Sequence, residues 1–423
     1  MKYFFTMLLT IFSLMAFAQN DSWYLLKPGR VFDGEIMHDG WVVLIHNNKI
    51  VQAGEIAFKL PAETKVIDLK GMTLLPGFIE GHSHIFLHPY NEVSWDDQVL
   101  KESRAERNAR AVKHAEATLL AGFTTMRDLG TEGAMYDDAG IKTAIEKGVI
   151  IGPRMIVATR AIVAKGSYGV KSENADVDFP KGAAEAGNED EMRKEARVQI
   201  SKGADLVKVY ADYRWGLDDA IAPAFSEKEI AAAVEVAQSS GRYVSAHSAS
   251  VEGMKRSIEA GVHTIEHGDY GTEEVFREMK EKGIALCPTL AAGEAIAEYD
   301  GWKKGTLPEP QRIISKKKSF AAALRAGVTI CMGGDVGVFP HGDNAREMEL
   351  MVEYGMKPLD VLKSATSVNA DVFGYRDRIG RIKKDLLADL IAVEGDPSAN
   401  IHDIRKVVFV MKNGIVYKDN LKK

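Results

Sequence analysis

Two histidines lie one residue apart at the end of an apolar run. The stretch reads GFIEGHSHIF (77–86), so on a strand His82 and His84 would point to the same face. Two imidazoles on one face can supply half of a metal site. The alternative is a pair of strand-end histidines that each bind a backbone carbonyl, and the motif alone leaves both readings open.

Four more residues of metal-ligand type follow other apolar runs along the chain. Lys208 lies in LVKVY, His247 in VSAHS, His267 in IEHG and Asp335 in MGGD. Each has a structural alternative when taken singly; the Lys208 ammonium, for example, could pair with Asp335. The carboxyl ends of parallel strands meet at one edge of a sheet or barrel, where active sites are built. We therefore expect these four side chains to join the two histidines there.

The elements that must position these residues follow two patterns. Over 77–377, short apolar runs alternate with amphipathic helical segments, which predicts an α/β chain with parallel strands closed into a (β/α)₈ TIM-like barrel. A doubly wound open sheet is the alternative. Short strand patterns over 19–76 and 378–423 predict a small β-sandwich made from both chain ends, with the barrel inserted between them. Polar or glycine-containing stretches over 164–187 and 291–311 predict two long loops at the catalytic edge.

The first residues and the composition restrict location and partners. Residues 1–18 have one early lysine, an apolar core and a small-residue end, which predicts a secretory signal peptide cleaved after Ala18 and a periplasmic protein. A membrane anchor is the alternative, but the run is short for a spanning helix. The formal charge is −6, and there is no basic run with interleaved aromatics, so we expect neither nucleic acid nor, after cleavage, a membrane as partner. Cys287 and Cys331 imply no disulfide framework and are expected to be buried thiols.

Taken together, these motifs resemble the amidohydrolase superfamily of metal-dependent hydrolases. The resemblance rests on GFIEGHSH, TTMRDLG, VKVY, AHS, IEHG and GGD, and it spans nearly the whole mature chain. VKVY and the secretory signal are most similar to the Xaa-Pro dipeptidase and imidazolonepropionase-like branch. One departure is IKKDLLADL, where the family often has a glycine-lysine pair before its last AD motif. This departure lies in the predicted sandwich and leaves the metal site unaffected.

The resemblance implies a binuclear metal centre. Its ligands would be His82, His84 and Asp335 on one divalent ion, His247 and His267 on the second, and a carboxylated Lys208 that bridges both. A free lysine is cationic at neutral pH and would be a poor ligand. Imidazole and carboxylate ligands without a thiolate suit Zn²⁺, while Mn²⁺, Co²⁺ and Fe²⁺ remain open.

The resemblance also implies a reaction. A hydroxide that bridges the two ions would attack the carbonyl of a C–N amide bond, and Asp335 would carry its proton to the leaving nitrogen. We expect dipeptides of the Xaa-Pro type, or N-acyl amino acids with a free carboxylate, as substrates. Cyclic amides or xenobiotic and toxin amides are the second choice. A non-catalytic metal-binding periplasmic protein is the alternative of another class. A homo-oligomer is compatible with the resemblance.

Further residues are candidates for supporting roles. Tyr210, Arg214 and His341 are expected to contact the substrate, against the simpler readings of a packed rim tyrosine, a surface arginine and a solvent-exposed loop histidine. Arg127 and Asp128, at the end of the second predicted strand of the barrel, would either orient the metal ligands or form an ion pair with each other.

Overall fold

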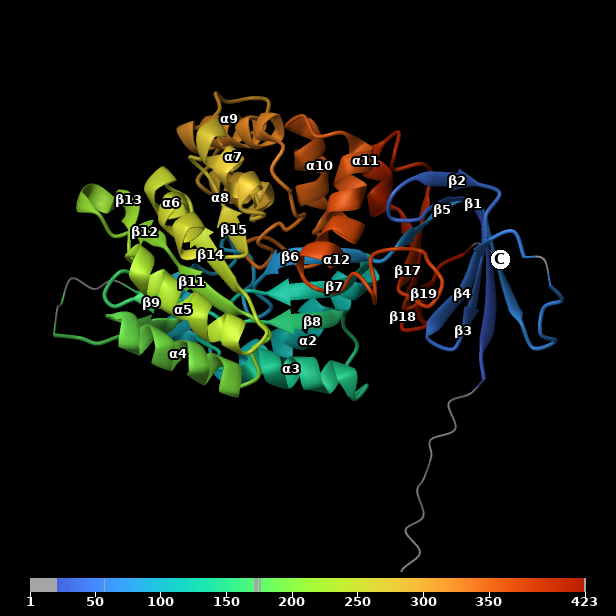
Figure 1. Cartoon of the computed structure of the whole chain (residues 1–423), viewed down its shortest axis with the longest axis horizontal. Helices are drawn as coiled ribbons and strands as arrows, with labels where there is room; N and C mark the ends of the chain where they lie inside the picture. Colours follow the sequence, from blue (N-terminus) through green and yellow to red (C-terminus); the bar gives the residue numbers. More distant parts are fainter. Residues whose placement is uncertain (1–20, 57, 171–173, 175, 422–423) are drawn as a thin grey trace, which may run out of the picture.

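A computed structural model describes residues 21–421 except 57, 171–173 and 175. The predicted signal peptide lies outside the described residues. Figure 1 shows a sheet formed by both chain ends beside a larger part in which strands alternate with helices. Within the described part of the chain, no helix combines the length and apolar character that a membrane span requires.

Both ends of the chain contribute to one eight-stranded sheet. Its strands are β1 (Trp23–Phe32), β2 (Met37–Asp39), β3 (Val42–His46), β4 (Lys49–Gly54), β5 (Lys65–Pro76), β17 (Leu390–Glu394), β18 (Val407–Lys412) and β19 (Ile415–Asp419). The order is β19-β18-β17-β5-β1-β3-β4, with β2 paired to β1. The two chain ends meet where β5 pairs antiparallel with β17.

This sheet curls around its own apolar core. Leu26, Val43, Leu74 and Phe409 are fully buried in that core, as the alternation along the strands predicts. A bridge between Lys49 and Leu387 joins the edge strand β4 to the segment just before β17. The contribution of both chain ends is as expected, while the predicted sandwich takes the form of one continuous sheet that returns on itself.

The α/β part contains two parallel sheets. Their strands are β6 (Phe78–Ser83), β7 (Phe123–Asp128) and β8 (Arg154–Val157) in one, and β9 (Ile162–Ala164), β10 (Ala184–Ala186), β11 (Val207–Tyr210), β14 (Val244–Ser248), β15 (Thr264–His267) and β16 (Ala285–Cys287) in the other. Single parallel bridges, Ser83 with Val336 and Leu286 with Ile330, place the segment around Asp335 between β6 and β16. The α/β class is confirmed, and closure into eight strand–helix units stays a prediction.

Helices connect and flank these strands (Figure 1). They are α1 (Trp95–Lys101), α2 (Arg104–Leu120), α3 (Asp137–Glu146), α4 (Glu189–Ser201), α5 (Glu227–Ser239), α6 (Val251–Ala260), α7 (Glu273–Glu281), α8 (Leu290–Tyr299), α9 (Gln311–Ala326), α10 (Ala345–Glu353), α11 (Pro358–Lys363) and α12 (Asn369–Val372). A short hairpin, β12 (Asp212–Arg214) with β13 (Ile221–Pro223), follows β11.

The predicted loop over 291–311 is wrong for its first half. That half is helix α8, in which seven of ten residues are buried, four of them alanines. The sequence signals were misleading because Gly293 interrupts the helical pattern and the N-cap residue, Thr289, makes no side-chain cap. By contrast, the described residues between β9 and β10 form neither helix nor strand, in line with most of the loop expected over 164–187. The end of that predicted loop is wrong, because Ala184–Ala186 form strand β10, which pairs with β9.

Candidate metal centre

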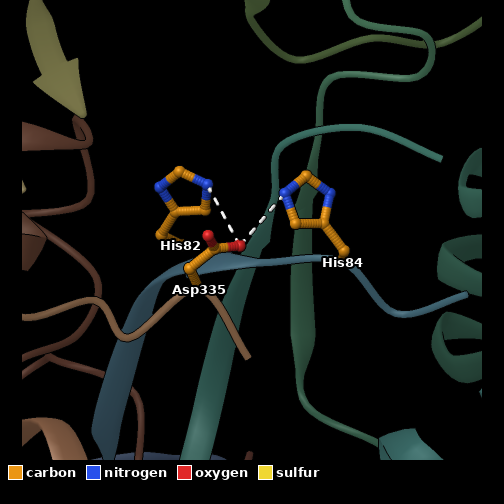
Figure 2. Close-up of side chains that lie close together, drawn as sticks. All are labelled: His82, His84 and Asp335. Carbon is orange, nitrogen blue, oxygen red and sulfur yellow. Dashed lines mark ion pairs between the residues drawn. The ribbon is translucent and has the colours of Figure 1, made fainter. Parts of the chain in front are cut away.

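His82 on β6 and His84, directly after that strand, point toward the same carboxylate, as their spacing predicts. Both are buried, with 1% and 5% of their surface exposed. The Asp335 Oδ1 atom lies 3.7 Å from His82 Nε2 and 3.3 Å from His84 Nε2. Figure 2 shows the two imidazoles directed at Asp335 from different sides. The three side chains place potential ligand atoms within 4.8 Å of one another, a spacing that one metal ion could bridge.

The remaining three predicted ligands lie beside this trio. The ring of His267 is 5.1 Å from that of His82 and 4.2 Å from that of His247, between centroids. Lys208 is on β11, adjacent to β14, which carries His247. Lys208 is buried, with 1% of its surface exposed. Its positive charge also lowers the pKa values of His82, His247 and His267. The structure therefore brings the six predicted side chains together.

Burial and neighbouring charges set the protonation of these groups. Burial and the Lys208 cation lower the pKa of His82 to about 4 and that of His247 to about 3, so both imidazoles are neutral at pH 7. Burial alone would raise the pKa of Asp335, but His82 and His84 hold it at about 2. The neutral His82 and His247 and the ionised Asp335 therefore have the protonation states that metal ligation requires. Burial lowers the pKa of His84, but the Asp335 carboxylate outweighs burial and raises that pKa to about 9, so His84 would lose a proton when it binds a metal ion.

Two polar atoms in this cluster have no hydrogen-bond partner within the described structure. They are Lys208 Nζ and Asp335 Oδ1, both buried. An unpaired buried ammonium is costly, and burial accordingly lowers the pKa of Lys208 to about 8. Divalent cations would satisfy both the carboxylate and a carboxylated amine. The donor set therefore fits a metal centre.

A buried carboxylate that the sequence analysis missed orients His82. Glu266 Oε2 lies 2.9 Å from His82 Nδ1, and its Oε1 accepts from Arg127 Nη2 at 2.8 Å and from Ser245 Oγ at 2.7 Å. With Nδ1–H donated to the carboxylate, Nε2 is left with its lone pair facing Asp335. The available signal was a glutamate inside the buried strand Thr264–His267.

Arg127, Asp128 and the remaining histidines make different contacts around the candidate metal centre. Arg127 pairs with Glu266 and does not form the ion pair with Asp128 that was one of the two expectations. Both carboxylate oxygens of Asp128 are buried without a hydrogen-bond partner in the described structure. His84 Nδ1 lies 2.9 Å from the carbonyl oxygen of Gly130. His267 Nδ1 lies 2.8 Å from the Thr289 hydroxyl, so loop and helix-cap residues complete the support.

A pocket with a volume of about 320 Å³ opens onto these ligands. Tyr210 and Arg214 line it, and Tyr210 stacks on His247 with 4.5 Å between ring centroids. Their contact with a substrate stays a prediction. His341 is not a wall residue. It stacks on His114 at 4.3 Å, and its Nε2 lies 3.3 Å from the backbone oxygen of His84. The expectation that His341 contacts the substrate is therefore not supported: the ring packs behind His84.

The family of the chain follows from its match to known proteins. Residues 73–418 match the sequence profile of the amidohydrolase family. The chain belongs to the amidohydrolase family. This amidohydrolase is 31% identical to ochratoxinase of Aspergillus niger, over 93% of this chain and 85% of ochratoxinase.

Solved structures agree with this assignment. A Xaa-Pro dipeptidase with bound methionine superimposes with a TM-score of 0.82 and 30% identity, over 94% of this chain and 100% of the other. A prolidase complexed with N-methylphosphonate-L-proline gives 0.82 at 26% identity, over 94% and 100% of the two chains. These amidohydrolase neighbours imply a TIM-barrel-like α/β fold, and family membership makes the chain a hydrolase that acts on amide bonds.

Proposed function

We propose that this amidohydrolase is a binuclear metal-dependent hydrolase of dipeptides of the Xaa-Pro type or of N-acyl amino acids with a free carboxylate. The observation that carries the proposal is the Lys208 amine, which is buried among histidines beside Asp335 and has no hydrogen-bond partner among the described residues. A structural lysine at this depth would be paired with a carboxylate. A ligand role for a carboxylated Lys208 accounts for both its burial and its missing partner.

The ligands divide into two sets around Lys208. His82, His84 and Asp335 would hold one divalent ion, and His247 and His267 the other, with Zn²⁺ our expectation. When bound, two such ions lower the pKa of a water molecule and polarise a scissile carbonyl. Carboxylation joins the neutral Lys208 amine to CO₂ and releases one proton, and the lowered pKa of Lys208 increases the fraction of that neutral amine.

Two side chains act directly on the substrate in this proposal. Asp335 is an ionised carboxylate at the proposed metal centre and lines the pocket, so it would accept the proton of the attacking water and deliver it to the leaving nitrogen. Tyr210 faces the pocket, and burial raises the pKa of its hydroxyl well above the ordinary value, so it remains a donor toward a substrate oxygen. The guanidinium groups of Arg214 and Arg312 line the same pocket and suit a substrate carboxylate.

The similarity to a Xaa-Pro dipeptidase and a prolidase favours the dipeptide substrate. The identity to ochratoxinase favours a second candidate, hydrolysis of a toxin amide. The residues before the described part of the chain lead us to propose also that the enzyme is exported to the periplasm.

Metal analysis combined with a substrate panel tests the proposal. Purified protein reconstituted with zinc should hold about two ions per chain and hydrolyse Xaa-Pro dipeptides or N-acyl amino acids. D335N should keep most of the metal and lose turnover by about a hundredfold or more. Less than one tightly bound ion together with no hydrolysis anywhere on the panel would refute the proposal. Turnover of ochratoxin alone would favour the second candidate.

A further inference from the structure

A buried carboxylate that the proposed reaction does not use lies at the pocket wall. Glu132 is only 3% exposed and lines the pocket, on the loop that follows β7. Its backbone has a φ of 47°, a left-handed conformation that a glutamate rarely adopts. A strained backbone at a pocket wall is common where a side chain has a binding role.

The two oxygens of Glu132 have different surroundings. Oε2 accepts from Tyr168 Oη at 2.6 Å and from Trp95 Nε1 at 2.9 Å, and these two bonds fix the carboxylate. Oε1 accepts no hydrogen bond in the described structure, and its nearest cationic candidate is His84 Nδ1, at 3.8 Å. That nitrogen already has a partner, since it lies 2.9 Å from the oxygen of Gly130. The carboxylate is thus held firmly with one oxygen unused.

The buried arginine on this side, Arg107, makes no ion pair with Glu132 in the described structure. The Arg107 guanidinium donates instead to the backbone oxygens of Phe86 and Thr131, at 3.3 to 3.4 Å. Several tyrosines surround the carboxylate, and their phenol groups bring no positive charge at neutral pH. A cationic ligand group in the pocket would therefore complete the set of partners of Glu132.

The position of Glu132 relative to the metal centre suggests which cation that is. One imidazole separates them: His84 Nδ1 faces Glu132 Oε1 at 3.8 Å, and His84 Nε2 faces Asp335 Oδ1 at 3.3 Å. In a dipeptide, the α-ammonium group and the scissile carbonyl belong to the same residue and are two bonds apart. A carboxylate one side chain away from the reacting centre suits the ammonium group when the carbonyl lies at the metal ligands.

We propose that Glu132 binds the free α-ammonium group of the substrate's N-terminal residue, so that the enzyme prefers dipeptides to N-acyl amino acids. This inference rests on the proposed function and decides between its two substrate classes. A charge-assisted hydrogen bond to a buried carboxylate favours the ammonium. An acyl group that lacks the amine leaves that carboxylate desolvated and unpaired, and this discriminates strongly against it.

Binding of two matched compounds tests the inference without turnover. Alanyl-proline and N-propionyl-proline differ only in the α-amino group. Calorimetric titration of zinc-loaded D335N should give a Kd for alanyl-proline about tenfold or more below that for N-propionyl-proline. In D335N/E132Q the two Kd values should become equal. Equal binding in D335N, binding of neither compound, or a preference that survives E132Q would overturn the inference.

Two further variants separate substrate binding from a structural role. Y168F removes one bond to Glu132 Oε2 but leaves Oε1 unchanged, so the preference for the free amine should persist. If Glu132 only holds the wall in place, E132Q should weaken both compounds alike. E146Q, on the exposed end of α3, is the matched control and should bind both compounds as its parent does. If wild type binds less than one zinc ion and hydrolyses no compound of the substrate panel while the binding preference is present, the proposed function fails and the ammonium subsite stands.

Discussion

At the scale of single residues, Glu266 connects the proposed metal ligand His82 to a buried arginine. It contacts His82 at 2.9 Å and the fully buried Arg127 at 2.8 Å. We predict that E266Q weakens zinc binding by about 10- to 100-fold, because the amide orients His82 less firmly. It should also lower the free energy of unfolding by about 3 kcal/mol, because Arg127 loses its buried counter-ion. Zinc titration and urea unfolding measure both effects, and wild-type zinc affinity in E266Q would contradict the assigned role.

Glu347 gives a residue-scale prediction about pH. Its Oε2 accepts from the Ala291 backbone at 2.7 Å, its Oε1 is buried without a partner in the described structure, and burial raises the pKa of its carboxyl to about 8. Between the ordinary pKa of 4.5 and 8, the folded state binds more protons than the unfolded state. This contribution to stability is therefore complete below pH 4.5 and is lost as the pH rises through 8.

E347Q should remove that dependence. Its free energy of unfolding relative to wild type should increase from pH 5 to pH 9 by on the order of 3 kcal/mol. Urea unfolding of the metal-free protein at both values measures the difference, with E146Q as the exposed control. A difference between E347Q and wild type that is the same at both values would show that Glu347 ionises normally.

At the scale of elements, the N-termini of two helices have different roles: one stabilises its helix and the other supports a proposed metal ligand. α5 begins with a capping box, in which Ser226 and Glu229 bond each other's backbone N–H. At α8, Thr289 caps nothing and its hydroxyl contacts His267 instead. We predict that S226A lowers the free energy of unfolding by about 1 kcal/mol and leaves kcat unchanged. T289V should lower zinc affinity and kcat with little loss of stability. Equal effects of the two substitutions on zinc affinity would contradict this division.

The elements also show what the sequence could predict. The sequence could predict which residues lie at the strand ends, and the carboxyl ends of parallel strands share one edge. His82, Lys208 and His267 could therefore be grouped from the sequence alone. Glu266 and Arg127 could not be paired in this way. They are 139 positions apart, and their contact depends on which strands face each other across the interior. The role of Glu132 could not be predicted from the sequence either. Its two hydrogen-bond partners come from α1 and from the loop after β9, which are distant in the chain.

At the scale of the molecule, the chain-end sheet is tied to the α/β part through Asp389. Its backbone oxygen accepts from Gly77 N at 2.8 Å, and its carboxylate accepts from Arg154 at 2.9 Å and from Asn413 N at 2.7 Å. Arg154 begins β8, in the same sheet as β6, which carries His82. These buried contacts lead us to expect that the two parts unfold together.

Metal removal tests both the site and this coupling. The proposed ligands come from β6 and the residue after it, from β11, β14 and β15, and from the segment around Asp335, and the unfolded chain does not hold them together. Zinc would therefore bind mainly the folded state, and free zinc at a thousandfold excess over Kd would stabilise it by about 4 kcal/mol. Chelation should lower the Tm of the whole chain by several degrees, as one calorimetric transition. The zinc-dependent shift should shrink in H267A and persist in E146Q. Two transitions, only one of them sensitive to zinc, would show that the chain-end sheet unfolds separately, and an unchanged Tm would argue against a tightly bound metal.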